Sequence, residues 1–126
     1  MATKPKILCI EDDREMVDLL RLILEPKGFD FVSAEGGREG LDKARTERPD
    51  LILLDLMMPD IDGWEVYRQL MADDELGNIP VIVVTVRTQG IDEALGLHLG
   101  EIEGYITKPF SPGELLENIG RVLGEE

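Results

Sequence analysis

Five side chains that could do chemistry together follow apolar runs, or lie near their ends, at distant points in the sequence. Glu11 and Asp12 come directly after the run KILCI, and Asp55 ends the run LILLD. Thr85 lies near the end of the run IPVIVVTV, and Lys108 follows the short run GYIT. Carboxylates gathered in one place repel one another unless a positive charge lies among them. Three carboxylates, a hydroxyl and an ammonium therefore indicate a site for a cation and an anionic substrate.

A hard divalent cation is the natural occupant of such a cluster, because it offsets the charge of the carboxylates. Mg²⁺ takes a few carboxylate oxygens together with water and phosphate oxygens, in octahedral geometry. Cysteine and histidine ligands are absent from the cluster, so zinc is not favoured. An aspartate aimed at such a cation, here Asp55, can attack phosphorus as a nucleophile and form an acyl phosphate. The cation, the lysine and the hydroxyl can then each stabilise one oxygen of the transferred group.

Each of these residues also has a simpler interpretation when it is taken alone. The acidic residues 11–13 could cap the helix that follows and complement its dipole, and we expect that role for Asp13. Asp55 could form an Asx turn, Thr85 could be an ordinary β-branched strand residue, and Lys108 could be a solvated surface lysine. Their joint placement at successive strand ends favours the chemical interpretation.

The elements that must bring these side chains together alternate along the chain. Apolar runs predict strands, in chain order, over 6–10, 29–34, 51–56, 79–86 and 104–107. Helical spacing predicts helices over 14–27, 38–47, 64–72, 90–100 and 111–123. The last helix carries the pattern of an N-cap and a capping box at Ser111, Pro112 and Glu114.

A strand–helix unit repeated five times predicts an α/β fold with a parallel sheet, helices on both faces and right-handed crossovers. Such a sheet binds its ligands outside the carboxyl ends of its strands. The predicted site lies at that edge.

Composition excludes several other classes of function. The 126 residues fit one domain, and 27 acidic against 13 basic side chains give a formal net charge of −14. This charge argues against direct binding of nucleic acid or an anionic membrane, since both need a basic surface. No apolar stretch is long enough for a membrane span, and the first residues lack the apolar centre of a signal peptide.

The single cysteine points to a reducing compartment. Cys9 lies within the run ILCI, where a buried small hydrophobic residue is expected, and one cysteine cannot form an intrachain disulfide. We therefore expect a cytoplasmic protein.

Four stretches carry a more specific pattern: ILCIEDD, PDLILLDLMMPDIDGWE, IPVIVVT and YITKPFSPGEL. In this order and spacing, and over residues 5–124, the chain resembles the CheY-like receiver domain of two-component response regulators. The resemblance implies a flavodoxin-like, doubly wound sheet of five parallel strands in the order 2-1-3-4-5, with five helices on both faces. Residues 1–126 are then expected to form a single receiver domain with no output domain present, either as a stand-alone receiver or as a piece of a longer regulator.

The same resemblance implies roles for the site residues. Asp55 would accept a phosphoryl group from a sensor histidine kinase or a histidine phosphotransfer protein. Glu11 and Asp12 would hold Mg²⁺, for which Mn²⁺ can substitute, together with Asp55 and the backbone carbonyl of Met57. Lys108 would pair with the phosphoryl oxygens. Such a domain catalyses at most its own phosphorylation and dephosphorylation and is not a turnover enzyme.

The resemblance also implies a conformational change on phosphorylation that involves two positions. Thr85 would turn its hydroxyl toward the phosphoryl group, and Tyr105 would move inward with it. The bond before Pro109 is expected to be cis. The output would be a contact with a downstream protein target or a phosphorylation-dependent homodimer, with no direct nucleic-acid or membrane binding.

The chain departs from the family pattern in three places. Val86 stands where a small residue is usual, so its branched side chain could crowd the phosphoryl pocket. The approach LGEIEGY at 99–105 is one residue longer than usual, which could remodel the surface of the predicted fourth helix. Met57 and Arg87 occupy the positions whose side chains tune the access of water to the phosphoaspartate.

Two other functions remain open on the sequence. A Mg²⁺-dependent phosphohydrolase of the haloacid-dehalogenase kind also uses an aspartyl intermediate, but it needs a second acid where this chain has Met57. A pseudo-receiver would bind its partner constitutively, and the complete set of five site residues argues against it. His98, the single histidine, is expected to be a helix or surface residue and not a phosphodonor.

Overall fold

A five-stranded parallel sheet forms the centre of the molecule. The computed structural model describes residues 4–86 and 102–124. The strands are β1 (Lys6–Ile10), β2 (Asp30–Ala34), β3 (Leu51–Leu54), β4 (Val81–Val86) and β5 (Gly104–Lys108). They pair in the order β2-β1-β3-β4-β5, which confirms the predicted flavodoxin-like topology.

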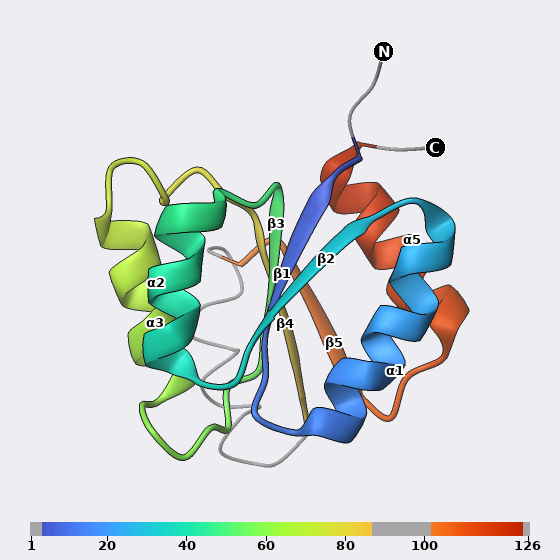
Figure 1. Ribbon diagram of the computed structural model, residues 1–126, viewed down its shortest axis with the longest axis horizontal. Coiled ribbons are helices and arrows are strands. Elements are labelled where there is room, and N and C mark those ends of the chain that lie inside the picture. Colours follow the sequence, from blue (N-terminus) through green and yellow to red (C-terminus); the bar gives the residue numbers. More distant parts are fainter. Residues whose placement is uncertain (1–3, 87–101, 125–126) are drawn as a thin grey trace.

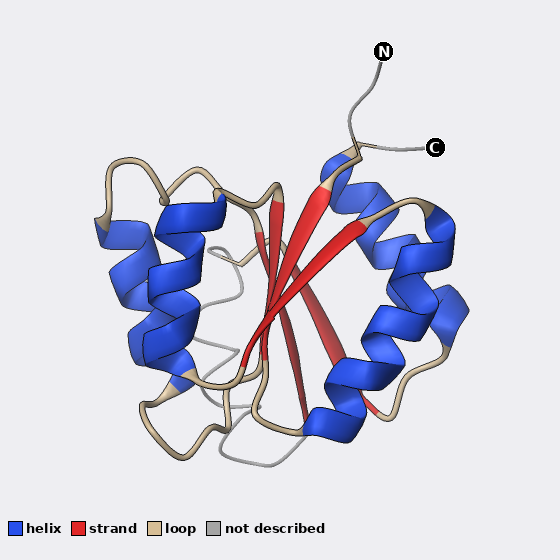
Figure 2. Cartoon of the chain, viewed as in Figure 1, coloured by secondary structure: helices blue, strands red, loops and turns tan. Residues whose placement is uncertain are grey.

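Helices cover both faces of this sheet. The described helices are α1 (Arg14–Leu24), the 3₁₀ turn η1 (Glu25–Lys27), α2 (Gly37–Glu47), α3 (Gly63–Ala72) and α5 (Pro112–Leu123). In Figure 1, α1 and α5 lie on one side of the sheet and α2 and α3 on the other, and Figure 2 shows the same layers by element type. The helix predicted over 90–100 lies outside the described residues.

The ends of two elements differ from the sequence prediction for local reasons. The helix predicted over 14–27 leaves α geometry at Leu24, because Pro26 has no N–H to donate to the preceding turn. Gly28 then adopts a positive φ of 93° and ends the segment, as predicted. The strand predicted over 51–56 ends at Leu54, so Asp55 lies just beyond the sheet. The capping box of α5 is confirmed at Ser111 and Glu114.

Two buried clusters fill the space between the sheet and its helices. One packs beneath α2 and α3 and includes Leu54, Val66 and Leu70, while the other packs beneath α1 and α5 and includes Leu53, Leu20 and Ile119. Successive side chains of β3 point to opposite faces of the sheet, and both faces are covered by helices. The continuous apolar run LILL is explained by this burial on both sides.

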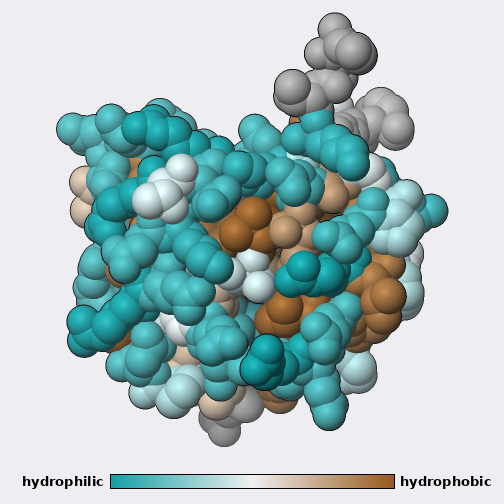
Figure 3. Space-filling model, in the orientation of Figure 1, coloured by the Kyte–Doolittle hydropathy of each residue, from teal (hydrophilic) through white to brown (hydrophobic). Residues whose placement is uncertain are grey.

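Polar groups dominate the face of the molecule that looks toward α1, β2 and α2. The face drawn in Figure 3 is mostly hydrophilic, with a few apolar patches between polar groups. Within the described residues, no helix is both long and apolar enough to cross a membrane.

Candidate functional site

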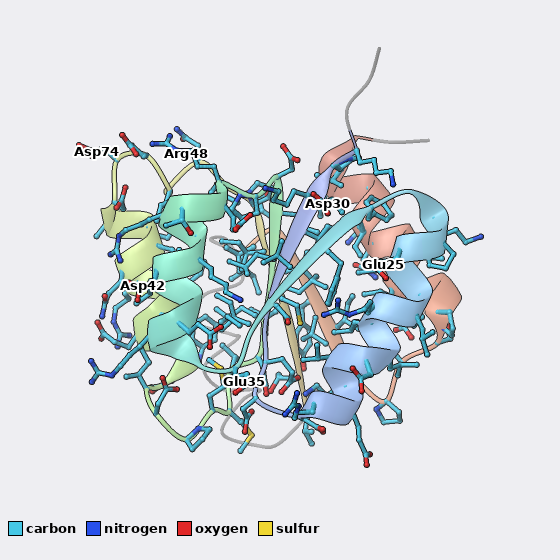
Figure 4. All side chains as sticks on the ribbon, in the orientation of Figure 1. Glu25, Asp30, Glu35, Asp42, Arg48 and Asp74 are labelled. Carbon is cyan, nitrogen blue, oxygen red and sulfur yellow. The ribbon has the colours of Figure 1, made fainter. Side chains whose placement is uncertain are left out.

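The strand register brings the acidic residues of the first and third strands to one edge of the sheet. The Asp55 N–H donates to the carbonyl of Ile10 at 3.1 Å, and the Glu11 N–H donates to the carbonyl of Ala34 at 3.0 Å. The residue after β3 is therefore fixed beside the end of β1. In Figure 4, Glu35 marks this carboxyl edge after β2, while Asp30 marks the opposite end of the same strand.

Three carboxylates converge at this edge, as predicted. Ligand oxygens of Glu11, Asp12 and Asp55 all lie within 4.8 Å of one another. Glu11 and Asp55 are buried, whereas Asp12 is exposed to solvent. Oxygen donors from a few carboxylates, one of them open to water, are the ligands that Mg²⁺ prefers, so the residues fit that ion.

Lys108 supplies the positive charge of the cluster. Its Nζ donates to Glu11 Oε1 at 2.5 Å and lies 3.6 Å from Asp55 Oδ2. Burial by itself lowers the pKa of Lys108, but the hydrogen bond to Glu11 and the charge of Asp55 raise it overall. The ammonium therefore stays charged and faces the oxygen that we expect to react.

Glu11 is a buried carboxylate whose charged form is disfavoured by its surroundings. Burial, and next its hydrogen bond with Asp55, raise the pKa of Glu11 to about 7, while Lys108 acts in the opposite direction. Among the described residues at this edge, two buried carboxylates and one ammonium leave an excess of negative charge, which a divalent cation would offset.

Binding of Mg²⁺ is expected to strengthen as the pH rises through 7. Below the raised pKa of about 7, Glu11 carries a proton that must leave before its carboxylate can face a cation. We expect the apparent Kd to be about tenfold weaker at pH 6 than at pH 8. Isothermal titration calorimetry at both pH values measures this ratio. In Glu11→Gln the Kd should be nearly the same at pH 6 and pH 8. Equal affinities at both pH values would contradict the assignment.

Thr85 contributes a buried hydroxyl near the carboxyl end of β4. The residue is completely buried in β4, and its register partner on β5 is Thr107. Within the part of the chain that the structure describes, the Thr85 hydroxyl makes no hydrogen bond. A buried polar atom without a partner is rare and calls for an explanation, and an oxygen-rich ligand at this edge would supply one.

The turn after β3 holds Asp55 in place. The Met57 N–H donates to Asp55 Oδ1 at 3.1 Å, so the Asx-turn interpretation of Asp55 is also correct. The Met57 side chain is exposed. Asp62 caps α3 through the Trp64 N–H, and the Gly63 N–H donates to the Leu56 carbonyl.

The remaining predicted positions fall in three groups. Asp13 caps α1 by accepting from the N–H groups of Glu15 and Met16, and the bond before Pro109 is cis, as expected. Tyr105 is half-buried in β5 and packs against the cluster beneath α2 and α3, whereas half of the Val86 side chain is exposed. Arg87, His98 and part of the 99–105 approach lie outside the described residues.

Two features of the site were not anticipated from the sequence. Asp60, in the loop after β3, accepts from the N–H groups of Gly37 and Arg38 at the start of α2. Gly63 packs so closely on the Asp55–Leu56 backbone that a Cβ there would lie only 2.8 Å from the Asp55 carbonyl oxygen. The stretch PDIDG signals a turn, but contacts between distant segments cannot be read from it.

A family model for the response regulator receiver domain matches residues 7–120. The chain belongs to this family. It is 42% identical over 118 residues to the alkaline phosphatase synthesis transcriptional regulatory protein PhoP of Bacillus subtilis, covering 94% of this chain and 48% of PhoP. It is 41% identical to the polar-differentiation response regulator DivK of Brucella anthropi, covering 96% of this chain and 98% of DivK. The chain thus spans about half of one relative and nearly all of the other.

A solved structure shares the fold and was determined with a metal ion bound. The receiver domain of a sensor histidine kinase from Pseudomonas aeruginosa superposes with a TM-score of 0.87 at 26% identity, covering 98% of this chain and 100% of that one. That structure has a magnesium ion coordinated in its active site cleft. Receiver domains act in two-component signalling and generally are not turnover enzymes, so the present chain is a signalling domain that carries an acidic cluster at the carboxyl edge of its sheet.

Proposed function

We propose that this receiver domain is a phosphoaspartate switch in which Asp55 accepts a phosphoryl group. The observation that carries this proposal is the arrangement around one buried carboxylate. Asp55 lies beside the Glu11 and Asp12 carboxylates, and the Lys108 ammonium is 3.6 Å from its Oδ2. The donor is a sensor histidine kinase or a histidine phosphotransfer protein, in agreement with the family.

The transfer forms one bond and breaks another. A carboxylate oxygen of Asp55 attacks the phosphorus of a phosphohistidine, the P–N bond breaks, and its electron pair returns to the imidazole, which takes up a proton. Lys108 holds one phosphoryl oxygen by charge, and the Thr85 hydroxyl, which has no hydrogen-bond partner among the described residues, donates to another. The Met57 N–H keeps the Asp55 carboxylate in one orientation for attack.

Glu11, Asp12, Asp55 and the Met57 backbone carbonyl would hold the cation. Mg²⁺ supplies positive charge that offsets the carboxylates and the phosphoryl oxygens, and Mn²⁺ could replace it. The exposed Asp12 carboxylate gives the ion an approach from solvent.

A phosphohydrolase of the haloacid-dehalogenase kind is the less favoured alternative. Such an enzyme needs a general acid two residues after its nucleophile, and Met57 cannot transfer a proton there.

Incubation with acetyl phosphate and Mg²⁺ should load the protein with phosphoryl groups, and EDTA should prevent loading. A phosphomonoester should give almost no turnover. Steady hydrolysis of the monoester would favour the enzyme, and no loading of a folded protein would favour a pseudo-receiver.

The phosphorylated state is expected to be long-lived because of Met57. Its thioether is exposed beside the site and accepts hydrogen bonds only weakly, so it cannot orient an attacking water. We expect Met57→Asn to lose phosphate about tenfold faster, because an amide can position water. The rate of inorganic phosphate release after removal of acetyl phosphate measures this. Met57→Leu should behave like the parent, and an asparagine variant that releases phosphate no faster would contradict the role.

Output is proposed to follow from a rearrangement of Thr85 and Tyr105. When Thr85 turns toward the phosphoryl group, the half-buried Tyr105 can move inward and change the surface around β5. A downstream protein or a second copy of the domain would recognise that surface.

We propose residues 5–124 as the folded unit. We also propose a reducing, cytoplasmic location, which is supported by the single, buried Cys9.

A further inference from the structure

The N-terminus of α2 is capped by a residue that is not part of α2. The N-cap residue itself is Gly36, which has no side chain to offer. Instead Asp60, from the loop between β3 and α3, accepts from the Gly37 N–H at 3.0 Å through Oδ1 and from the Arg38 N–H at 3.1 Å through Oδ2. One carboxylate thus satisfies two free N–H groups of a helix that begins 23 residues earlier in the chain.

The two glycines at the start of α2, Gly36 and Gly37, leave the room that this contact needs. A Cβ on Gly36 would lie 2.9 Å from Asp60 Oδ2, and a Cβ on Gly37 would clash with the side chains of Ile61 and Val66. The loop therefore lies directly on the start of α2, with the apolar Ile61 side chain over Gly37 and against the buried cluster. The pair Gly36-Gly37 is explained by this close approach.

The contact is charge-assisted and stable at neutral pH. The hydrogen bond from Gly37, followed by that from Arg38, lowers the pKa of Asp60, so the carboxylate remains ionised. A negative charge at this position also complements the positive end of the α2 dipole.

The same loop carries the Met57 carbonyl, which the proposed function assigns to the cation. It begins at Asp55, whose carboxylate accepts from the Met57 N–H, and it closes where the Gly63 N–H donates to the Leu56 carbonyl. Asp60 lies midway between these two fixed ends. A loop held at both ends and at its middle has few ways to move its Met57 carbonyl.

We propose that Asp60 is a positioning residue of the site: by capping α2 it fixes the β3–α3 loop, and through the loop it fixes Met57 against Asp55 and the cation. This inference rests on the proposed function for the role of Mg²⁺, but the coupling between α2 and the loop exists without any ligand.

Amide hydrogen exchange of the metal-free protein tests the coupling directly. In Asp60→Ala the Gly37 and Arg38 amides lose their acceptor, and the Met57 and Gly63 amides should also exchange about fivefold faster because the loop opens more often. Asp60→Asn keeps one acceptor and should restore most of the protection. Faster exchange confined to Gly37 and Arg38 would overturn the proposal, since Asp60 would then be only a local cap.

Asp73→Ala is the matched control. Asp73 also accepts from two backbone N–H groups, those of Glu75 and Leu76, but it follows α3 at the opposite edge of the sheet. This variant should leave the Met57 and Gly63 amides unchanged. Equal acceleration in Asp73→Ala would show a general loosening of the fold and would also overturn the proposal.

Mg²⁺ affinity provides the second measurement. Asp60→Ala should raise the Kd for Mg²⁺ by about tenfold, as expected for a group that orients a ligand, whereas Asp73→Ala should stay within about twofold. An unchanged Kd in Asp60→Ala would overturn the positioning role. A parent protein that takes up no phosphoryl group would count against the proposed function alone, because the exchange rates would still decide the coupling.

Discussion

Gly63→Ala is expected to destabilise the protein by about 3 kcal/mol, because its new Cβ would press on backbone. The Cβ would clash with the Cα of Leu56 and lie 2.8 Å from the Asp55 carbonyl oxygen and 2.9 Å from that of Leu56. Backbone cannot swing aside as a side chain can, so either α3 or the site must shift. Urea denaturation of the metal-free protein measures the loss.

Gly113→Ala provides the matched control for that substitution. Gly113 lies in the first turn of α5, and a Cβ there would meet nothing within 4 Å. The alanine should be neutral or stabilise the fold by up to about 1 kcal/mol, because it reduces the freedom of the unfolded chain. If both variants had the same stability, the close packing of α3 on the Asp55–Leu56 backbone would be wrong.

Asp55→Asn is expected to abolish phosphoryl acceptance while making the metal-free protein more stable. The substitution removes one of two buried carboxylates and leaves Glu11 paired with Lys108 at 2.5 Å. The asparagine oxygen can still accept from the Met57 N–H, which preserves the turn. We expect a gain of about 1 kcal/mol, seen as a rise of about 4 °C in Tm.

The control for this prediction is an aspartate away from the cluster. Asp30 is exposed at the opposite end of β2 (Figure 4), so Asp30→Asn should leave Tm nearly unchanged. Mg²⁺ should stabilise the parent more than Asp55→Asn, since the variant has lost a ligand. A metal-free Asp55→Asn protein that melts below the parent would contradict the excess of negative charge that we infer around Glu11.

The sequence predicts that the side chains of the site lie together because a general rule of parallel sheets applies to them. The carboxyl ends of β1 and β3 meet at one edge, so residues that follow two apolar runs, Glu11 and Asp55, had to be neighbours. Thr85 and Lys108 followed from the same rule. The topology needed only the alternation of strands and helices, together with four motifs in a fixed order.

The parts that sequence reasoning missed depend on contacts between distant segments. The cap of α2 by Asp60 joins residues 23 positions apart, and nothing in the composition of either segment marks it. The hydrogen bond from Lys108 to Glu11 spans 97 positions. The predicted end of a helix was wrong where a single residue sets it. At Pro26 the missing N–H ends α1 earlier than the helical spacing predicts.

The central claim is that Asp55 is the residue that becomes phosphorylated. Mass spectrometry of the parent protein after incubation with acetyl phosphate and Mg²⁺, followed by peptide mapping, tests this most directly. We predict a gain of one phosphoryl group, located on the peptide that contains Asp55 and absent from Asp55→Asn. A folded protein that gains no mass, or a phosphoryl group mapped to any other residue, would contradict the claim.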